Sequence, residues 1–317
     1  MRNDPAARAA ISTLHVSCDL ILDLLRASQG PLNVIDTLIR AGVVQANIAA
    51  ATGELDAQLL YGDLDAIPPD AMRRPVSISR LAQGLRLPFE TVRRHVKSLC
   101  DRGFCEMHRR GVMVPAAYFE QQQSKVAVAA VNAMTAQTFH RLAAGGFFEA
   151  RALPEPSGQP AMSPPRAVTR LVTDYSLRAA EMLREAWSDN LTALLLMQMM
   201  RMNATDGAAF DQPVTASRMA EEVDMKLETA RRRLVRLAEV GLCKQTGDGY
   251  VVFEGTFAPF SSEALQTNEM NLWRLYRNCA LVGAVEAWRA EGGPSTADAP
   301  DQADSAEGGR GLRESGS

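Results

Sequence analysis

Aromatic residues and long apolar runs are both scarce in this chain of 317 residues. Phe, Trp and Tyr together make up 6% of it. Its most apolar stretch, 191–200, is too short to cross a bilayer and is followed at once by Arg201. The N-terminal residues contain no uninterrupted apolar segment of the kind that a secretory signal peptide needs. We therefore expect a cytoplasmic protein with no membrane partner.

Signatures of disulfide scaffolds, metal centres and common enzymes are also missing. The five cysteines are odd in number and form no C-x-x-C pair: Cys18, Cys100, Cys105, Cys243 and Cys279. The four histidines have no metal-ligand spacing and no nearby acidic partners: His15, His95, His108 and His140. The sequence contains no G-x-S-x-G, P-loop, dinucleotide-binding or H-E-x-x-H motif. We therefore expect no enzymatic activity, no metal and no cofactor.

Positive charge is in short supply overall but is concentrated in two places. The formal net charge is −3, which argues against a protein that coats nucleic acid without selectivity. Residues 86–110 nevertheless carry a net charge of +4 and residues 224–248 a net charge of +2, so the rest of the chain sums to −9. Local basic patches on an acidic body suit a selective DNA-binding protein.

The two basic segments belong to an internal repeat. Residues 75–114 align with residues 213–252 at a constant offset of 138, without a gap and with 14 of 40 positions identical. The identical positions include the pattern Thr-x-Arg-Arg at 91–94 and at 229–232. Cys105 and Cys243 are also equivalent, and we expect both to be small buried hydrophobes rather than redox-active thiols.

Each copy predicts two helices followed by a hairpin. In the first copy, Ser77 caps a short helix, residues 86–88 form a turn, and a second helix spans Phe89–Asp101 until Gly103 stops it. Three apolar side chains fall on one face of that second helix: Val92, Val96 and Leu99. In the second copy the corresponding cap is Thr215, the stop is Gly241, and the buried face carries Ala230, Leu234 and Leu237. Hairpin turns are expected at 109–111 and 246–249.

This pattern resembles the winged helix-turn-helix of bacterial transcriptional regulators of the IclR, MarR and ArsR kind. The matching positions in the first copy are Ser77, Leu81, Ala82, Thr91, Val92, Arg94, Val96, Leu99, Gly103 and Phe104. The second copy departs from the pattern at Ala230, where a larger residue is usual, and at Asp224 in its turn. The resemblance implies a mainly α fold with two duplicated winged helix-turn-helix units, motifs 75–119 and 213–257, flanking helices and short two-stranded wings. It also implies sequence-specific binding to double-stranded DNA.

Polar and basic positions on the second helix and the wing of each copy are the expected DNA contacts. They are Thr91, Arg93, Arg94, Lys97, Arg109 and Arg110 in the first copy and Thr229, Arg231, Arg232 and Arg236 in the second. Arginine pairs bidentately with guanine, while lysine supplies phosphate contacts. The second wing, at 247–249, has no positive charge, so the second copy is expected to bind more weakly, bind differently or act as a pseudo-dimer partner.

Composition divides the chain into two helical units. Residues 1–150 form the first unit, the proline-rich segment 151–166 a linker, residues 167–290 the second unit, and residues 291–317 a disordered acidic tail. In each unit, helices precede the motif and one helix follows it. The expected flanking helices are 14–29, 33–52, 121–144, 167–187, 190–204 and 262–290. Asn33 and Asn190 are expected to open comparable helices.

Two other functions stay open at this point. The first is a protein-interaction scaffold that makes no contact with DNA, and the second is a regulator gated by a small-molecule effector near Met197–Met202. Core packing is the simpler explanation of these methionines. Three aromatic residues of the last helix either face a partner subunit in a homodimer or pack against the second motif: Trp273, Tyr276 and Trp288.

Overall fold

The computed structural model describes residues 5–50, 52–157, 164–204 and 210–291. Within these ranges the chain is mainly helical, with two small two-stranded antiparallel sheets. The elements of the first half are α1 (Pro5–Gln29), α2 (Val34–Ile48), α3 (Leu55–Leu60), α4 (Ile78–Leu85), α5 (Phe89–Asp101), β1 (Glu106–His108), β2 (Gly111–Met113), α6 (Ala116–Glu120) and α7 (Gln122–Ala144). Those of the second half are α8 (Pro165–Trp187), α9 (Asn190–Asn203), α10 (Ala216–Glu222), α11 (Leu227–Glu239), β3 (Lys244–Thr246), β4 (Gly249–Val251), α12 (Glu254–Phe257), α13 (Ser262–Leu281) and α14 (Ala284–Glu291).

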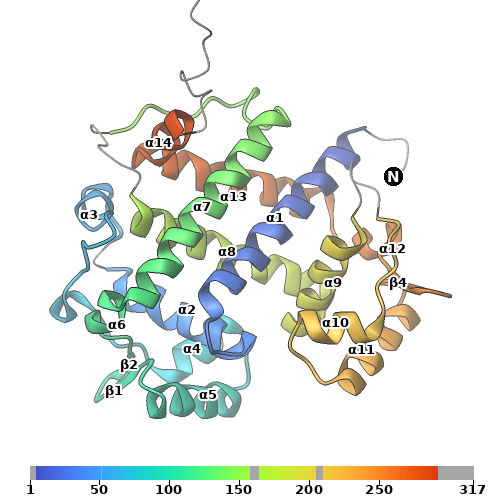
Figure 1. Cartoon of the computed structure of the whole chain (residues 1–317), viewed down its shortest axis with the longest axis horizontal. Helices are drawn as coiled ribbons and strands as arrows, with labels where there is room; N and C mark the ends of the chain where they lie inside the picture. The colour runs from blue at the N-terminus through green and yellow to red at the C-terminus, as the bar shows by residue number, and fades with distance from the viewer. Residues whose placement is uncertain (1–4, 51, 158–163, 205–209, 292–317) are drawn as a thin grey trace, which may run out of the picture.

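Four long helices, α1, α7, α8 and α13, form the centre of the molecule (Figure 1). Helix α1 packs on both α7 and α13, and α8 packs on the same two helices. Helices α1, α2 and α7 correspond to α8, α9 and α13. Every contact among these six helices has a counterpart when each helix is replaced by its equivalent. The two halves of the chain are therefore interlocked in an arrangement close to two-fold symmetry.

The buried residues form two hydrophobic cores of different size. The smaller core lies within residues 32–119, which we call the first lobe, and joins α2, α4, α5 and the hairpin. The larger core runs from Leu14 on α1 to Trp288 on α14 and includes the second repeat. The segment 151–166 thus separates the two sequence repeats but does not separate the two cores. Residues 158–163 of that segment and 292–317 of the predicted tail lie outside the described residues.

The two repeats fold alike because equivalent residues do the same local tasks. The Ser77 hydroxyl accepts a hydrogen bond from the Arg80 amide at 3.2 Å, and Thr215 repeats this cap with Arg218 at the same distance. In each repeat, a residue in the left-handed region follows the first helix. These residues are Arg86 (φ 51°) after α4 and Asp224 (φ 48°) after α10. Thus the unusual Asp224 occupies the same backbone conformation as its counterpart, and Asp tolerates this conformation well.

Both hairpins have the same register and are attached to the chain in the same way. Glu106 pairs with Met113 in the first, and Lys244 with Val251 in the second. An isolated antiparallel bridge also ties each hairpin to the segment before α4 or α10, through Val76 in the first repeat and Val214 in the second. Gly111 (φ 137°) permits this bridge, because a Cβ there would lie 2.2 Å from the Val76 carbonyl oxygen.

A buried asparagine in the preceding helix holds each hairpin in place. The Asn47 amide donates to the carbonyl oxygens of Arg74 and Val112 at 2.9 and 3.2 Å, and its oxygen accepts from the Val114 amide at 2.9 Å. Asn203 repeats all three bonds.

The partners of Asn203 are the Gln212 and Tyr250 carbonyl oxygens and the Val252 amide, at 2.5, 3.2 and 2.8 Å. The duplication therefore extends to α2 and α9. It also corrects one expectation: the residue that caps α9 is Asp189, so the counterpart of the cap Asn33 is Asp189 and not Asn190.

The last predicted helix, 262–290, is two helices rather than one. Helix α13 ends at Leu281 and α14 begins at Ala284, with Gly283 in a left-handed conformation (φ 82°) between them. Tyr276 and Trp288 are fully buried, and their rings lie against Phe139 of α7. These aromatics therefore pack against the end of the first half and not against the second repeat. Helix α2 is also shorter than expected, since it ends at Ile48.

Several side chains singled out in the sequence are buried. Met197, Met199 and Met200 belong to the larger core, as their helix α9 packs on α1 and α8. Burial raises the pKa of Cys105 to about 12 and that of Cys243 to about 11, which disfavours the reactive thiolate. Among the helices that the structure describes, none combines the length and apolar character needed to cross a bilayer.

Candidate nucleic-acid interface

Helix α5 presents a basic face to solvent because its apolar face is fully used in packing. It lies against α2 and α4, and the side chains on that side are completely buried: Val92, Val96 and Leu99. The side chains of Arg93, Arg94 and Lys97 are exposed, and Thr91 is half-buried beside them. The sequence therefore assigned these positions to the correct face of the helix.

The basic side chains of α5 are weakly engaged within the protein. Arg93 Nε lies 2.8 Å from a Glu90 carboxylate oxygen, and Lys97 Nζ lies 3.1 Å from one of Asp101. Both pairs are exposed pairs within the helix, which contribute little to stability. Arg94 forms no ion pair with any residue that the structure describes. Replacing these contacts with an external anion would therefore cost little.

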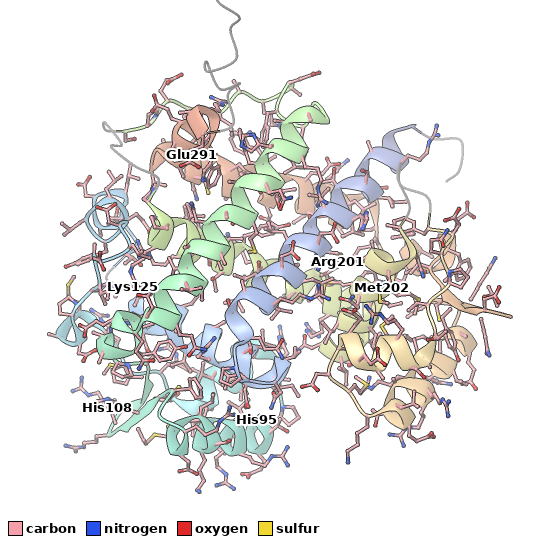
Figure 2. The ribbon with its side chains drawn as sticks, viewed as in Figure 1. His95, His108, Lys125, Arg201, Met202 and Glu291 are labelled. Carbon is pink, nitrogen blue, oxygen red and sulfur yellow. The ribbon has the colours of Figure 1, made fainter. Side chains whose placement is uncertain are left out.

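The first hairpin extends the same basic surface. Arg109 and Arg110 form its exposed turn, and neither is paired with a carboxylate in the described part of the chain. Figure 2 shows His108, the last residue of β1, on this projecting hairpin, with His95 on the neighbouring helix. Met107 on the same hairpin is 55% exposed.

The second repeat carries a similar but smaller basic surface. Arg231 and Arg232 on α11 are exposed, while the half-buried Thr229 takes the place of Thr91. Arg236 is exposed and lies 3.2 Å from Glu239. Arg233 points elsewhere, toward the cap Asp189 at 3.4 Å.

Four substitutions make the second repeat less basic than the first. At the offset of 138, Lys97 corresponds to Val235 and Arg102 to Val240, and both valines are exposed, at 43% and 50%. The hairpin turn Arg109–Arg110 corresponds to Gly247–Asp248. The second repeat has therefore kept the Arg-Arg pair and lost four of the surrounding cations, while Arg236 is gained at the position of Ser98.

The predicted contact residues do not form one continuous site. Those of the first repeat lie together in the first lobe, and those of the second lie on α11. In Figure 1 the helices α5 and α11 run along the same lower edge of the molecule, one on each side of the central bundle. The two helices that carry the predicted contacts therefore lie along one edge of the molecule in this view.

An exposed apolar residue at the start of each second helix was not among the predicted contacts. Phe89 is 48% exposed and Leu227, its counterpart, is 37% exposed. Apolar side chains at this position can contact thymine methyl groups in a major groove. The alignment of the two repeats, which pairs Phe89 with Leu227, could have indicated these two residues.

A buried carboxylate fixes how α5 sits on α2. His95 Nδ1 lies 2.7 Å from Asp36 Oδ1, and Arg102 Nη1 lies 3.4 Å from Asp36 Oδ2. Asp36 is only 3% exposed. The expectation that the histidines lack acidic partners was therefore wrong for His95, whose partner is distant in sequence. It was also wrong for His15 and His108, which lie 3.7 Å from Asp19 and 3.5 Å from Glu106. His95 and Arg102 belong to the support of α5 rather than to its free basic face.

Comparisons with protein-family models, curated proteins and solved structures gave no match to this chain.

Proposed function

We propose that this chain is a sequence-specific DNA-binding regulator of transcription in which each repeat acts as a winged helix-turn-helix. The observation that carries the proposal is the exposed Arg-Arg pair that recurs at equivalent positions of α5 and α11, on helices that line one edge of the molecule. A helix with a buried apolar face and free arginines offers both the phosphate contacts and the base contacts that a major groove requires.

The asymmetry of the two surfaces predicts unequal contributions. The first repeat combines Arg93, Arg94 and Lys97 with a basic wing at 109–110, so it supplies most of the binding free energy. The second repeat, with Arg231 and Arg232, adds a weaker contact. One chain then covers two half-sites about one helical turn apart, as a symmetric dimer of single motifs would. The two half-sites need not share a sequence.

A gel-shift titration of the full chain tests this function. The DNA would be fragments selected from a random library and the gene's own upstream region, at two salt concentrations. The variants are Arg93→Ala/Arg94→Ala and Arg231→Ala/Arg232→Ala. The matched control is Arg274→Ala/Arg277→Ala, which removes the same charge from exposed positions on α13, outside both repeats.

We expect roughly a hundredfold loss of affinity for the first variant, since each base-reading arginine is worth on the order of 1–3 kcal/mol. The second variant should lose roughly tenfold, and the control should bind as the wild type does. Equal losses in all three variants would mean that only net charge matters, and failure to enrich any sequence from the library would reject the proposal.

The exposed apolar residues of α11 favour one alternative role for the second repeat. Leu227, Val235 and Val240 give this helix an apolar component that its counterpart α5 does not share at the last two positions. Such a surface suits contact with another protein. If the Arg231→Ala/Arg232→Ala variant keeps full DNA affinity, we would assign the second repeat to a protein contact.

A further inference from the structure

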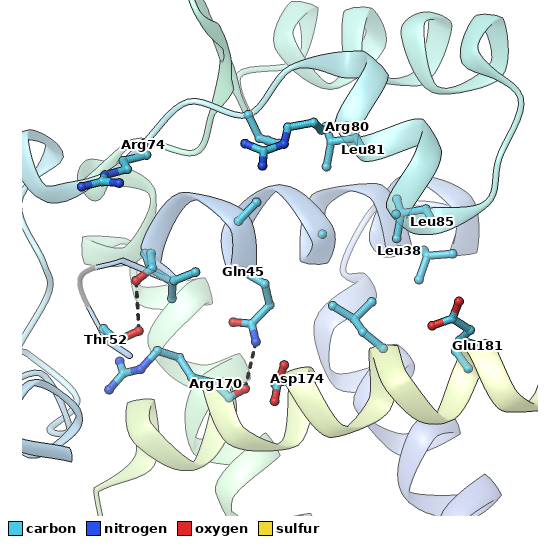
Figure 3. Close-up of a pocket in the computed structure, with 18 of the residues that line it drawn as sticks. Leu38, Gln45, Thr52, Arg74, Arg80, Leu81, Leu85, Arg170, Asp174 and Glu181 are labelled. Atoms are coloured by element: carbon cyan, nitrogen blue, oxygen red, sulfur yellow. Dashed lines mark hydrogen bonds between the residues drawn. The ribbon is translucent and has the colours of Figure 1, made fainter. Parts of the chain in front are cut away.

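A large groove runs between the first lobe and the central bundle. Helix α2 forms its floor, α4 one wall and α8 the other (Figure 3), and its volume is about 850 Å³. Leu81 and Leu85 line the α4 wall, and Leu171 and Leu177 line the α8 wall. Grooves of this size with apolar walls and a few polar groups are typical of small-molecule sites.

The charge in this groove is predominantly positive. Five arginines line it, against the two carboxylates of Asp174 and Glu181: Arg74, Arg80, Arg86, Arg170 and Arg184. The guanidinium of Arg170 is occupied by the side chain and carbonyl oxygen of Gln58 and by the Tyr61 carbonyl oxygen. Arg86 lies 3.5 Å from Glu181.

Two of these arginines stay available to a ligand. Figure 3 shows Arg74 and Arg80 on the opposite side of the groove from Asp174 and Glu181. Both are exposed, and neither forms an ion pair with a residue in the described ranges. Cations gathered in an apolar-walled groove focus a positive potential that attracts anions.

A smaller groove runs along α10, the helix of the second repeat that corresponds to α4, and there the cations are paired with carboxylates. Arg218, the counterpart of Arg80, lies 2.7 Å from Glu222 and 3.4 Å from Glu221. Glu222 also pairs with Arg26 of α1 at 2.5 Å. These residues line this groove of about 480 Å³ between α10 and α1.

The difference between the grooves comes from three aligned positions. Glu221, Glu222 and Asp224 of the second repeat correspond to residues 83, 84 and 86, which are Gln, Gly and Arg. The second repeat shows that acidic residues fit at these positions and that one of them, Glu222, bridges the repeat to α1. In the first repeat all three acids are absent, and the arginine that they would neutralise is exposed in the groove.

From this comparison we infer that the groove between α2, α4 and α8 binds a small organic anion. Its acidic group lies against Arg80 and Arg74, and its apolar body lies between the leucines of α4 and α8. The smaller groove beside α10 has no such site. The inference depends on the groove alone and not on DNA binding, although the groove adjoins the first lobe.

Fluorescence titration with 8-anilinonaphthalene-1-sulfonate tests the site, because this probe is an organic anion with an apolar body. Its neutral analogue N-phenyl-1-naphthylamine lacks the sulfonate. We expect one saturable site for the anion on the full chain and at least tenfold weaker binding of the neutral analogue. Arg80→Gln should weaken binding of the anion at least tenfold, whereas the matched variant Arg218→Gln should change it less than twofold.

A second variant transfers the acidic residue of one repeat to the other. Gly84→Glu introduces the residue found at position 222, and a Cβ at Gly84 meets no atom within 4 Å, so the fold accommodates it. We expect this variant to lose binding of the anion, while Gly84→Ala retains it. Unchanged near-ultraviolet circular dichroism would verify that each variant is folded.

Equal binding by Arg80→Gln and Arg218→Gln, or equal affinity for the charged and neutral probes, would overturn the inference. Loss of binding in Gly84→Ala as well as Gly84→Glu would also overturn it, since steric filling would then explain the result. If the protein binds the probe but selects no DNA, the proposed function is rejected and the anion site is supported. If it selects DNA but does not bind the probe, the anion site is rejected and the proposed function is supported.

Discussion

The two repeats share one local structure but are anchored to the rest of the molecule in different ways. Each has the same caps, hairpin register and buried asparagine. The first repeat buries its side chains in a small core of its own, within residues 32–119. The second shares the large core with the central helices. Local sequence thus determines the structure of each repeat. The surrounding helices determine whether a repeat has a core of its own or shares that of the bundle.

The same contrast applies to the basic surfaces. The lobe with its own core carries the larger positive charge and the larger groove. The repeat built into the bundle carries fewer cations and a smaller groove whose arginines are paired with Glu222. Movement of one lobe against a fixed remainder is easier when their cores are separate. The first lobe is therefore the part of the molecule where binding and motion can be coupled.

The largest expected effect is the loss of stability on replacing a buried asparagine. Asn203→Ala would leave the Gln212 carbonyl oxygen and the Val252 amide without their partners and remove one of the two bonds to the Tyr250 carbonyl oxygen. We expect a loss of about 4 kcal/mol in unfolding free energy. Tryptophan fluorescence during urea denaturation measures it, because all three tryptophans lie in the second half, with Trp187 and Trp288 fully buried in the large core.

The matched variant Asn47→Ala removes the same three bonds from the first lobe. We expect little change in the tryptophan-monitored transition but faster amide hydrogen exchange across residues 75–114. An equal shift of the tryptophan transition in both variants would show that the two cores unfold as one.

The next effect in size concerns the glycine of each hairpin. Gly111→Ala would bring a Cβ to 2.2 Å from the Val76 carbonyl oxygen in a conformation with positive φ, and Gly249→Ala would bring one to 2.5 Å from that of Val214. We expect each to destabilise its repeat by about 2–3 kcal/mol. Thermal unfolding and hydrogen exchange measure this loss.

Gly84→Ala is the control, since this helical glycine has free space around it and alanine favours helix by about 0.5–1 kcal/mol. It should raise the melting temperature slightly. A melting temperature of Gly111→Ala equal to that of the wild type would mean that the bridge between Val76 and Val112 is dispensable.

Most of the repeat could be predicted from sequence, because its structure depends on local signals. Helix α5 was predicted at its observed bounds, since an apolar face of Val92, Val96 and Leu99 and the stop at Gly103 define it. The break between α13 and α14 was missed, since Gly283 interrupts a helical pattern that otherwise continues. Short helices such as α3 and α12 were also not predicted.

Features that depend on contacts distant in sequence could not be predicted. His95 and Asp36 are 59 residues apart, and only folding brings them together. The interlocking of α1 with α13 joins the two ends of the described chain, and no periodicity in either helix indicates its partner. The charge of the groove was likewise hidden, because Arg80 lies in the first repeat and Arg170 lies on α8, outside both repeats. Which surface residues touch DNA stays a prediction.

The smallest expected effect is a gain in DNA affinity from a lysine added to α11, and it depends on the proposed function. Val235 occupies the position of Lys97 and is 43% exposed, so Val235→Lys adds a cation without disturbing the core. We expect about a threefold gain in DNA affinity, as for one exposed charge contact. The logarithmic salt dependence should steepen by about 0.9, the value for one additional phosphate contact. Gel-shift titration over a range of salt concentrations measures both quantities.

The control for this gain is Val240→Lys, which adds the same charge just beyond the end of α11. If the second repeat docks as the first does, only the substitution at 235 should steepen the salt dependence, because position 240 is equivalent to Arg102, whose side chain faces Asp36 and not the free face of its helix. Equal steepening by both variants would mean that α11 attracts DNA only through net charge. If neither variant changes the affinity or its salt dependence, α11 is not part of the DNA interface, and the first lobe is the single DNA-binding part of the described chain.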